Sequence, residues 1–197
     1  MNTKALPELV LASTSVYRRE LLSRLQIPFV VASPDVDEAP RPGETPAATA
    51  LRLSEAKARA VKDRFPNALI IGSDQVAELD GEAIGKPMSR ENAIRQLTRM
   101  QGKGVFFHTG LCVYNSRSDR AQCELVPYRV RFRPLTQTQI ERYLAKEEPY
   151  NCAGSARTEG LGISLLEAMT GDDPTALIGL PLITLVRLLN NEGMDLP

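Results

Sequence analysis

The most constraining stretch of the sequence is residues 67–87, NALIIGSDQVAELDGEAIGKP, where a short apolar run meets a carboxylate. Leu69, Ile70 and Ile71 are too few for a helix and are rich in β-branched residues, so they predict a buried strand. Asp74 then lies at the expected C-terminal edge of that strand, where ligands bind in open α/β sheets. An acid at this edge is a candidate for metal or proton chemistry, and the alternative is that it only caps a turn.

A tight turn is predicted directly after this strand, at Asp80-Gly81, because this dipeptide strongly favours a two-residue hairpin. The expected strand pairs, counted from the turn, are Leu79 with Glu82, Ala77 with Ile84 and Gln75 with Lys86. In that register Lys86 lies diagonal to Asp74, within reach of a long side chain. Considered alone, the two residues could form a simple surface ion pair.

Length and composition limit the class of protein. At 197 residues and 43% hydrophobic content, residues 1–197 are expected to form a single domain, either with one sizeable core or divided into two lobes around a cleft. The 24 basic and 24 acidic residues cancel without forming a run of like charge, so no nucleic-acid polymer is expected as a partner. No apolar run reaches signal-peptide length or the roughly 20 residues of a membrane span. We therefore expect a cytoplasmic protein without membrane association.

Three cysteines and a single histidine argue against several chemistries. Cys112, Cys123 and Cys152 show no CxxC spacing, which without an export signal indicates reduced thiols. His108 has no second histidine with which to bind zinc, and no G-x-S-x-G motif accompanies it. We interpret His108 as a strand residue.

Cations occupy an unusual place near the N-terminus. A strand is expected over residues 9–12, and the hydroxyls of residues 13–15, beginning with Ser13, can cap the helix that follows. Arg18 and Arg19 fall in the first turn of this helix, where cations oppose the helix dipole. Free N–H groups beside two guanidiniums suit a polyphosphate, although two solvated arginines are the alternative.

An acidic, proline-rich loop follows a strand predicted over residues 29–32. Asp35, Asp37 and Glu38 offer carboxylate oxygens to a hard cation such as Mg²⁺, which takes one or two carboxylates and completes its shell with phosphate and water. Most acidic loops are only solvated, so this interpretation depends on what faces the loop.

The next helix, predicted over residues 45–61, carries a lysine on its apolar side. Thr45 and Pro46 suit the N-cap and first helical positions. Arg52 repeats with other charged residues on the expected solvated face, whereas Lys57 lies on the apolar stripe between Leu53 and Val61. An inward Lys57 that reaches a cleft anion is at least as plausible as one that extends to the rim. An apolar substitute at this position is expected to retain or raise thermal stability.

Later segments complete an α/β pattern. Two long strands are predicted over residues 105–115 and 123–135, a helix after Thr136, a strand over 163–169 and an interrupted apolar helix over 176–189. Between them, CAGSARTEGLGI places glycines around Glu159, and glycines allow a ligand to approach the backbone closely.

Seven segments occur in a recognisable order across nearly the whole chain: LASTSVYRRELL, DVDE, the helix with Lys57, IIGSDQV, GKP, CAGSARTEGLGI and LIGLPL. Together they resemble the Maf family of nucleotide pyrophosphatases. The resemblance implies an α/β, inosine-triphosphatase-like fold with a twisted mixed sheet, flanking helices and two lobes around a cleft. It also implies a protein, usually cytoplasmic and often a homodimer, that hydrolyses nucleoside triphosphates to monophosphate and diphosphate with a divalent metal cation, Mg or Mn.

The resemblance assigns roles to individual residues. Asp74 takes the place of the catalytic acid or base and, with Glu38, of a metal ligand. The phosphate-binding positions are Ser13, Arg18, Arg19, Lys57 and Lys86. These agree with the oddities already noted, namely arginines at the wrong helix end and a lysine on an apolar stripe.

Within the family, this chain resembles the 7-methyl-GTP branch, because it reads SDQ where the branch acting on dTTP and UTP typically reads SDT. The specificity positions are then Tyr17, Gln75 and Glu159. Methylation at N7 makes guanine cationic, so the face of Tyr17 attracts the base and Glu159 can accept from its N–H edge. The alternatives are a dTTP or UTP pyrophosphatase and a nucleotide-binding regulator of cell division without turnover.

Overall fold

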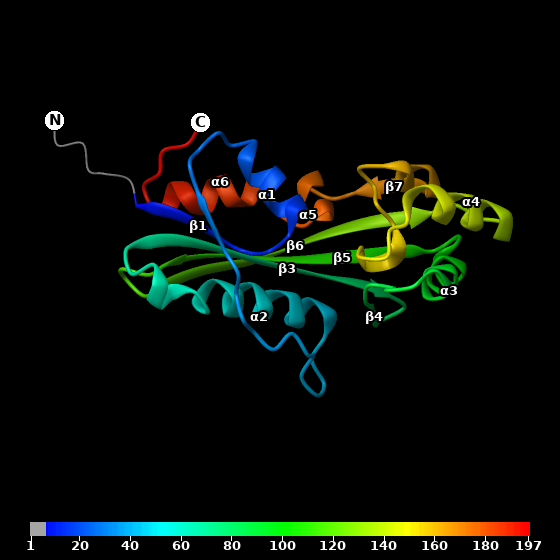
Figure 1. Ribbon diagram of the computed structural model, residues 1–197, viewed down its shortest axis with the longest axis horizontal. Helices are drawn as coiled ribbons and strands as arrows, with labels where there is room; N and C mark the ends of the chain where they lie inside the picture. Colours follow the sequence, from blue (N-terminus) through cyan, green and yellow to red (C-terminus); the bar gives the residue numbers. More distant parts are fainter. Residues whose placement is uncertain (1–6) are drawn as a thin grey trace.

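The protein is built around a single mixed β-sheet with helices on both faces. The computed structural model describes residues 7–197, whose seven strands are ordered β2-β1-β3-β5-β6-β7, with β4 paired to β3 off this path (Figure 1). β1 is parallel to β2 and β3, and the other pairs are antiparallel. The predicted α/β fold with a mixed sheet is confirmed.

The elements have the following bounds. The strands are β1 (Glu8–Ala12), β2 (Val30–Ala32), β3 (Ala68–Leu79), β4 (Glu82–Ile84), β5 (Gly104–Asn115), β6 (Arg120–Phe132) and β7 (Leu166–Thr170). The α-helices are α1 (Val16–Ser23), α2 (Pro46–Arg59), α3 (Arg90–Met100), α4 (Gln137–Glu147), α5 (Pro174–Ile178) and α6 (Leu182–Asn191). Short 3-10 turns are η1 (Lys62–Arg64), η2 (Ala153–Ser155) and η3 (Leu161–Leu165).

Alternate residues of β3 supply different apolar cores, as the period of a strand requires. Leu69 and Ile71 pack with α1 and α6, whereas Ile70 packs on the opposite face with α2. Further along, Ala77 and Leu79 join a separate core with α3 and α4. β3 therefore runs from one end of the molecule to the other, as β5 and β6 do beside it (Figure 1).

The predicted end of the strand at Asp74 is wrong, because β3 continues through this residue to Leu79. Pairing with β5 extends without a break from Leu69 to Glu78, although the apolar run that marked the strand ends at Ile71. On the opposite edge of β3 the pairing is interrupted, because β1 pairs with β3 only as far as Ile71.

The hairpin after β3 is confirmed for its first pairs and wrong for the last. Asp80 and Gly81 have φ values of 54° and 85°, as a type I′ turn requires, and Leu79 pairs with Glu82. β4 ends at Ile84, so the expected pair of Gln75 with Lys86 does not form. Within the described chain, residues 72–76 have no strand beside them on the edge shared by β1 and β4, and this gap holds Asp74.

Other boundaries differ modestly from expectation. The strand predicted over residues 163–169 is the turn η3 followed by β7, and the last apolar segment forms two helices separated by Gly179 and Pro181. His108 lies in β5, as interpreted, and the three cysteines are free thiols. Among residues 7–197, no helix is long and apolar enough to cross a bilayer.

Close approach between α2 and the sheet depends on two glycines. A Cβ at Gly72 would lie 2.1 Å from the Ser54 carbonyl oxygen, and one at Gly110 would lie 2.2 Å from that of Ala50. Both oxygens belong to the backbone of α2, so a side chain at either position would push the helix away from the sheet.

We therefore expect Gly72→Ala to lower the free energy of unfolding by at least about 2 kcal/mol, as overpacked sites do. The matched control is Gly85→Ala, because no atom of the described chain lies within 4 Å of a Cβ there. Denaturant unfolding of both variants measures the difference. Equal stability would contradict the close packing of α2.

Candidate active site

A large cleft lies where the sheet edge is interrupted. It encloses about 1260 Å³ and is lined by α1, the acidic loop, α2, the middle of β3, β4, the glycine-rich segment 151–159 and α5. Ligands commonly bind where the neighbours of a strand change, and here the partner of β3 changes from parallel β1 to antiparallel β4.

A buried ion pair lies at the centre of the cleft. The Lys57 ammonium is 2.5 Å from Asp74 Oδ1 and 2.7 Å from Glu38 Oε1. Lys57 is only 6% exposed and Asp74 7%, so each charge needs the other to offset its loss of hydration. The prediction that Lys57 points inward is confirmed.

The loop that carries Glu38 is fixed to α2 by Arg52. The Arg52 guanidinium donates to both carboxylate oxygens of Glu44, at 2.6 and 2.8 Å, and to the Ala39 carbonyl at 3.1 Å. The bonds from Arg52 to the Glu44 carboxylate lower the pKa of Glu44 to about 2, and the hydrogen bond from the Arg41 amide makes a smaller contribution. Arg52 was placed on the solvated face of its helix, and its role in holding this loop was missed.

The pKa of Glu38 itself is also lowered, chiefly by its hydrogen bond from Lys57. Its carboxylate is therefore charged near neutral pH and remains accessible from the solvent side, since 61% of the side chain is exposed. A charged, accessible carboxylate beside a buried one is a suitable arrangement for sharing a cation with bound phosphate.

The N-terminal end of α1 contributes polar groups to the cleft. Ser15 is the N-cap, and the buried Ser13 hydroxyl accepts from the Ser15 amide at 3.1 Å. Arg18 Nε donates to the Gly179 carbonyl at 2.8 Å, and the Ser73 hydroxyl donates to the same oxygen. The LIGLPL segment thus orients Arg18 and connects it to β3.

The other end of the cleft is built around Tyr17. The Arg157 guanidinium carbon lies 5.6 Å from the centroid of the Tyr17 ring, within the range of a cation–π contact. Arg157 Nη1 also donates to Glu147 Oε1 at 3.1 Å, and its Nε is buried without a hydrogen-bond partner in the described chain. Burial and the nearby Cys152 raise the pKa of Tyr17.

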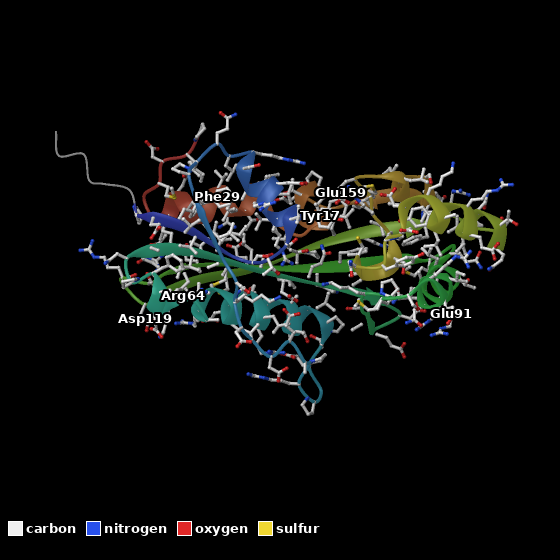
Figure 2. The ribbon with its side chains drawn as sticks, viewed as in Figure 1. Tyr17, Phe29, Arg64, Glu91, Asp119 and Glu159 are labelled. Carbon is white, nitrogen blue, oxygen red and sulfur yellow. The ribbon has the colours of Figure 1, made fainter. Side chains whose placement is uncertain are left out.

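Arg157 was not singled out from the sequence. The only signal was its position two residues before Glu159 in the glycine-rich segment. Glu159 is exposed and lines the cleft together with Tyr17, and its charge, in addition to burial, raises the pKa of the Tyr17 hydroxyl. Both residues are labelled in Figure 2.

Gln75 lines the cleft, but its side-chain nitrogen is already engaged. Nε2 donates to Thr109 Oγ1 at 3.0 Å and to the Ala176 carbonyl at 2.8 Å. Gln75 therefore holds α5 against the sheet as well as facing the cleft.

The cleft brings together most of the residues expected in the site. The residues that line it are Ser13, Tyr17, Arg18, Glu38, Lys57, Asp74, Gln75, Lys86 and Glu159. Arg19, Asp35 and Asp37 do not line it, so the expectations for these three residues are wrong. All three are exposed, and Arg19 points to a different side of α1 from Arg18. Lys86 is exposed at the rim.

The donor set fits a divalent cation that is also held by substrate. No cluster of three or more His, Cys, Asp or Glu side chains occurs among residues 7–197, so the chain does not form a closed metal cage there. Asp74 and Glu38 nevertheless both contact the Lys57 ammonium, so the two carboxylates lie close together and their remaining oxygens could hold a cation beside Lys57. Two carboxylates plus phosphate oxygens and water are a common Mg²⁺ shell.

Comparison with known proteins identifies the family. The profile described as Maf-like protein matches residues 8–192. The chain belongs to the Maf family. The resemblance inferred from its motifs is thereby confirmed, and the match includes every segment that lines the cleft.

Several similar proteins are named 7-methyl-GTP pyrophosphatase. The relative from Methylobacillus flagellatus is 60% identical over 190 residues, which is 96% of this chain and 99% of the relative. Those from Nitrosospira multiformis and Aromatoleum aromaticum are each 58% identical, over 96% of this chain and 96% and 98% of the relatives.

The geometry reverses our expectation for Lys57→Met. Because Lys57 pairs with two carboxylates, methionine would leave the buried Asp74 without its counter-charge. Removing one partner of a buried pair costs about 3 kcal/mol or more, so the free energy of unfolding at pH 7 should fall by roughly that amount.

Adding Asp74→Asn to Lys57→Met should recover much of this loss, because an amide carries no charge. Lys62→Met is the matched control, since Lys62 is exposed and lies just after α2. Denaturant unfolding measures all three variants. If Lys57→Met were as stable as the unmodified protein, the buried pair would have no energetic role.

Proposed function

We propose that this Maf protein hydrolyses 7-methyl-GTP to 7-methyl-GMP and diphosphate. The observation that carries the proposal is that the aromatic ring of Tyr17 and the carboxylate of Glu159 line the same cleft. A base stacked on Tyr17 would take the place of the Arg157 guanidinium that now lies over this ring. An aromatic face with a carboxylate close by suits a base that carries positive charge. The relatives named 7-methyl-GTP pyrophosphatase support the same substrate.

Asp74 is the proposed general base. One of its oxygens accepts from Lys57, which fixes the carboxylate and leaves the other oxygen for a water molecule. That water attacks the α-phosphorus; the new bond joins its oxygen to phosphorus, and the bond from phosphorus to the oxygen of the leaving diphosphate breaks. Asp74 receives the proton of the attacking water.

Cationic and hydroxyl groups around Asp74 are placed to hold the triphosphate. Ser13 and Arg18 approach from the start of α1, and Lys86 reaches in from the rim. A guanidinium and an ammonium stabilise the negative charge that develops on the leaving oxygens. Mg²⁺ or Mn²⁺, held by Asp74 and Glu38, would add charge neutralisation at the same phosphates.

The alternatives make different demands on the cleft. A pyrimidine such as that of dTTP or UTP carries no positive charge and gains little from the face of Tyr17. A regulator that binds without turnover would not need Asp74 within 2.5 Å of an orienting lysine. The proposal extends to a cytoplasmic homodimer that acts on free nucleotides rather than on nucleic-acid polymers, which the family resemblance and the balanced charge support.

We expect Asp74→Asn to lower kcat for hydrolysis by a factor of at least about 10², because the variant lacks the general base. The variant should still bind a non-hydrolysable 7-methyl-GTP analogue, because the shape of the site is kept. Diphosphate release and calorimetric binding measure the two effects. Near-normal turnover would remove Asp74 from the catalytic role.

Base choice is tested by Tyr17→Ala and Glu159→Gln. The unmodified protein should prefer 7-methyl-GTP to GTP, and both to dTTP and UTP. Each variant should lose on the order of tenfold in kcat/KM for 7-methyl-GTP and discriminate less among bases, because one charge-dependent contact is lost.

The control is Glu148→Gln, a carboxylate outside the cleft. Equal kcat/KM for dTTP and 7-methyl-GTP in the unmodified protein would contradict the choice of substrate while leaving pyrophosphatase activity in place.

A further inference from the structure

Gln96 does not line the cleft, but its side chain joins two backbone segments that contribute residues to it. It lies in α3, and both ends of its side-chain amide are engaged. Nε2 donates to the Gly85 carbonyl at 3.0 Å, and Oε1 accepts from the Ser155 hydroxyl at 2.5 Å. Gly85 immediately precedes Lys86, whereas Ser155 precedes Arg157 and Glu159.

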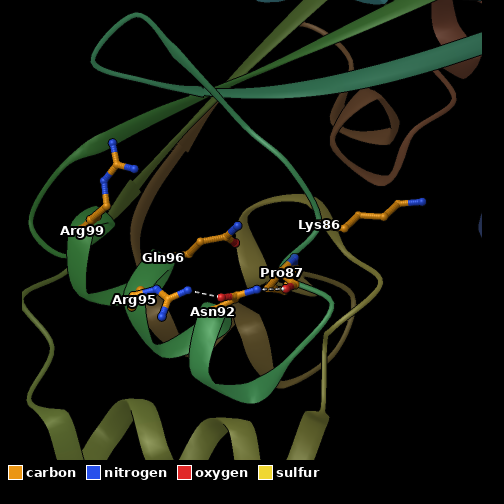
Figure 3. A pocket seen from close by; sticks show the side chains of 6 residues that line it. All are labelled: Lys86, Pro87, Asn92, Arg95, Gln96 and Arg99. Atoms are coloured by element: carbon orange, nitrogen blue, oxygen red, sulfur yellow. Dashed lines mark hydrogen bonds between the residues drawn. The ribbon is translucent and has the colours of Figure 1, made fainter. Parts of the chain in front are cut away.

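On the phosphate side, α3 holds the backbone on either side of Lys86. Gln96 bonds the carbonyl before this lysine, and Asn92 Nδ2 donates to the carbonyl after it, that of Pro87, at 2.7 Å (Figure 3). This loop has lost its strand partner, because β4 ends at Ile84. Its position therefore depends on these two side chains of α3 and on the hydrogen bond that the Met88 amide donates to the Tyr150 carbonyl at 3.1 Å.

On the base side, Ser155 is a constrained residue. It is fully buried and has a φ of 53°, a left-handed conformation that residues other than glycine adopt at a cost. Its hydroxyl bond to Gln96 is one of the contacts that hold it there. Two residues later, the Arg157 backbone is fixed by hydrogen bonds from Gly160 and Gly162 to its carbonyl.

We propose that Gln96 is a positioning residue which sets the Lys86 loop and the segment 155–159 at a fixed distance from each other. The proposal rests on the function argued above and specifies how base and phosphate recognition are coupled. With the two segments joined, a base seated correctly beside Tyr17 and Glu159 places its triphosphate within reach of Lys86. Without the connection, base and phosphates are bound independently, and the wrong base is rejected less well.

Two variants break this connection at different atoms. Gln96→Met keeps the length of the side chain and removes both hydrogen bonds, and Ser155→Ala removes only the bond on the base side. Each should reduce the ratio of kcat/KM for 7-methyl-GTP to that for GTP by about three- to tenfold, the factor that one neutral hydrogen bond is worth. The double variant should be no less selective than Gln96→Met, because both changes remove the same contact.

Gln101→Met is the matched control. Gln101 is the C-cap of the same helix, and its Oε1 accepts from the Leu135 amide at 3.2 Å, away from the cleft. Gln101→Met should lower the melting temperature about as much as Gln96→Met does, without changing the ratio of kcat/KM for 7-methyl-GTP to that for GTP. Asn92→Ala should raise KM for both nucleotides equally, because it loosens only the phosphate side.

Amide hydrogen exchange of the substrate-free protein tests the connection without any turnover. Gln96→Met should speed exchange in both segments, residues 85–88 and 153–160, whereas Gln101→Met should leave both unchanged. Failure of the unmodified protein to hydrolyse 7-methyl-GTP would overturn the proposed function, while the exchange measurement would still decide whether the two segments are joined.

Two results would overturn the proposal for Gln96. The first is unchanged exchange in either segment of the Gln96→Met variant. The second is a Gln96→Met variant that is less stable but keeps the selectivity of the unmodified protein, which would make Gln96 a structural residue only.

Discussion

A single buried ammonium imposes the main constraint on this structure. Lys57 is held between Asp74 and Glu38, and a charge so poorly hydrated persists only with partners at short distance. α2 must lie close to β3, which Gly72 and Gly110 allow by having no side chain. The loop with Glu38 must fold back onto α2, and Arg52 holds it there.

The cleft contains two positive charges that the chain itself supplies. At its centre the ammonium of Lys57 lies between two carboxylates, close to where a divalent cation is proposed. At one end the guanidinium of Arg157 lies over Tyr17, where a cationic base is proposed. An incoming divalent cation must therefore share the two carboxylates with Lys57, and a cationic base must take the place of Arg157 on the ring.

The sequence predicted the residues of the site better than the boundaries of the elements that carry them. Lys57 was found from helix periodicity, and the hairpin from Asp80-Gly81, because both signals are local. The course of β3 through Asp74 was missed, since that stretch is held by pairing with β5, nearly 40 residues further along the chain. Arg157 and Gln96 were missed for the same reason, because their partners lie on other elements.

The three long strands also limit how the molecule can move. β3 and β5 pass unbroken beneath the cleft and belong to the apolar cores at both ends, and β6 pairs with β5 along the whole length of β5. A hinge between the two ends of the molecule would have to bend these strands or break ladder hydrogen bonds, unlike the loop hinges of enzymes that close by domain rotation. We therefore expect the strands beneath the cleft to keep their shape when a ligand binds, whereas the acidic loop and the segment 151–159 can adapt. An inhibitor for this cleft should accordingly gain most from contacts with the strands.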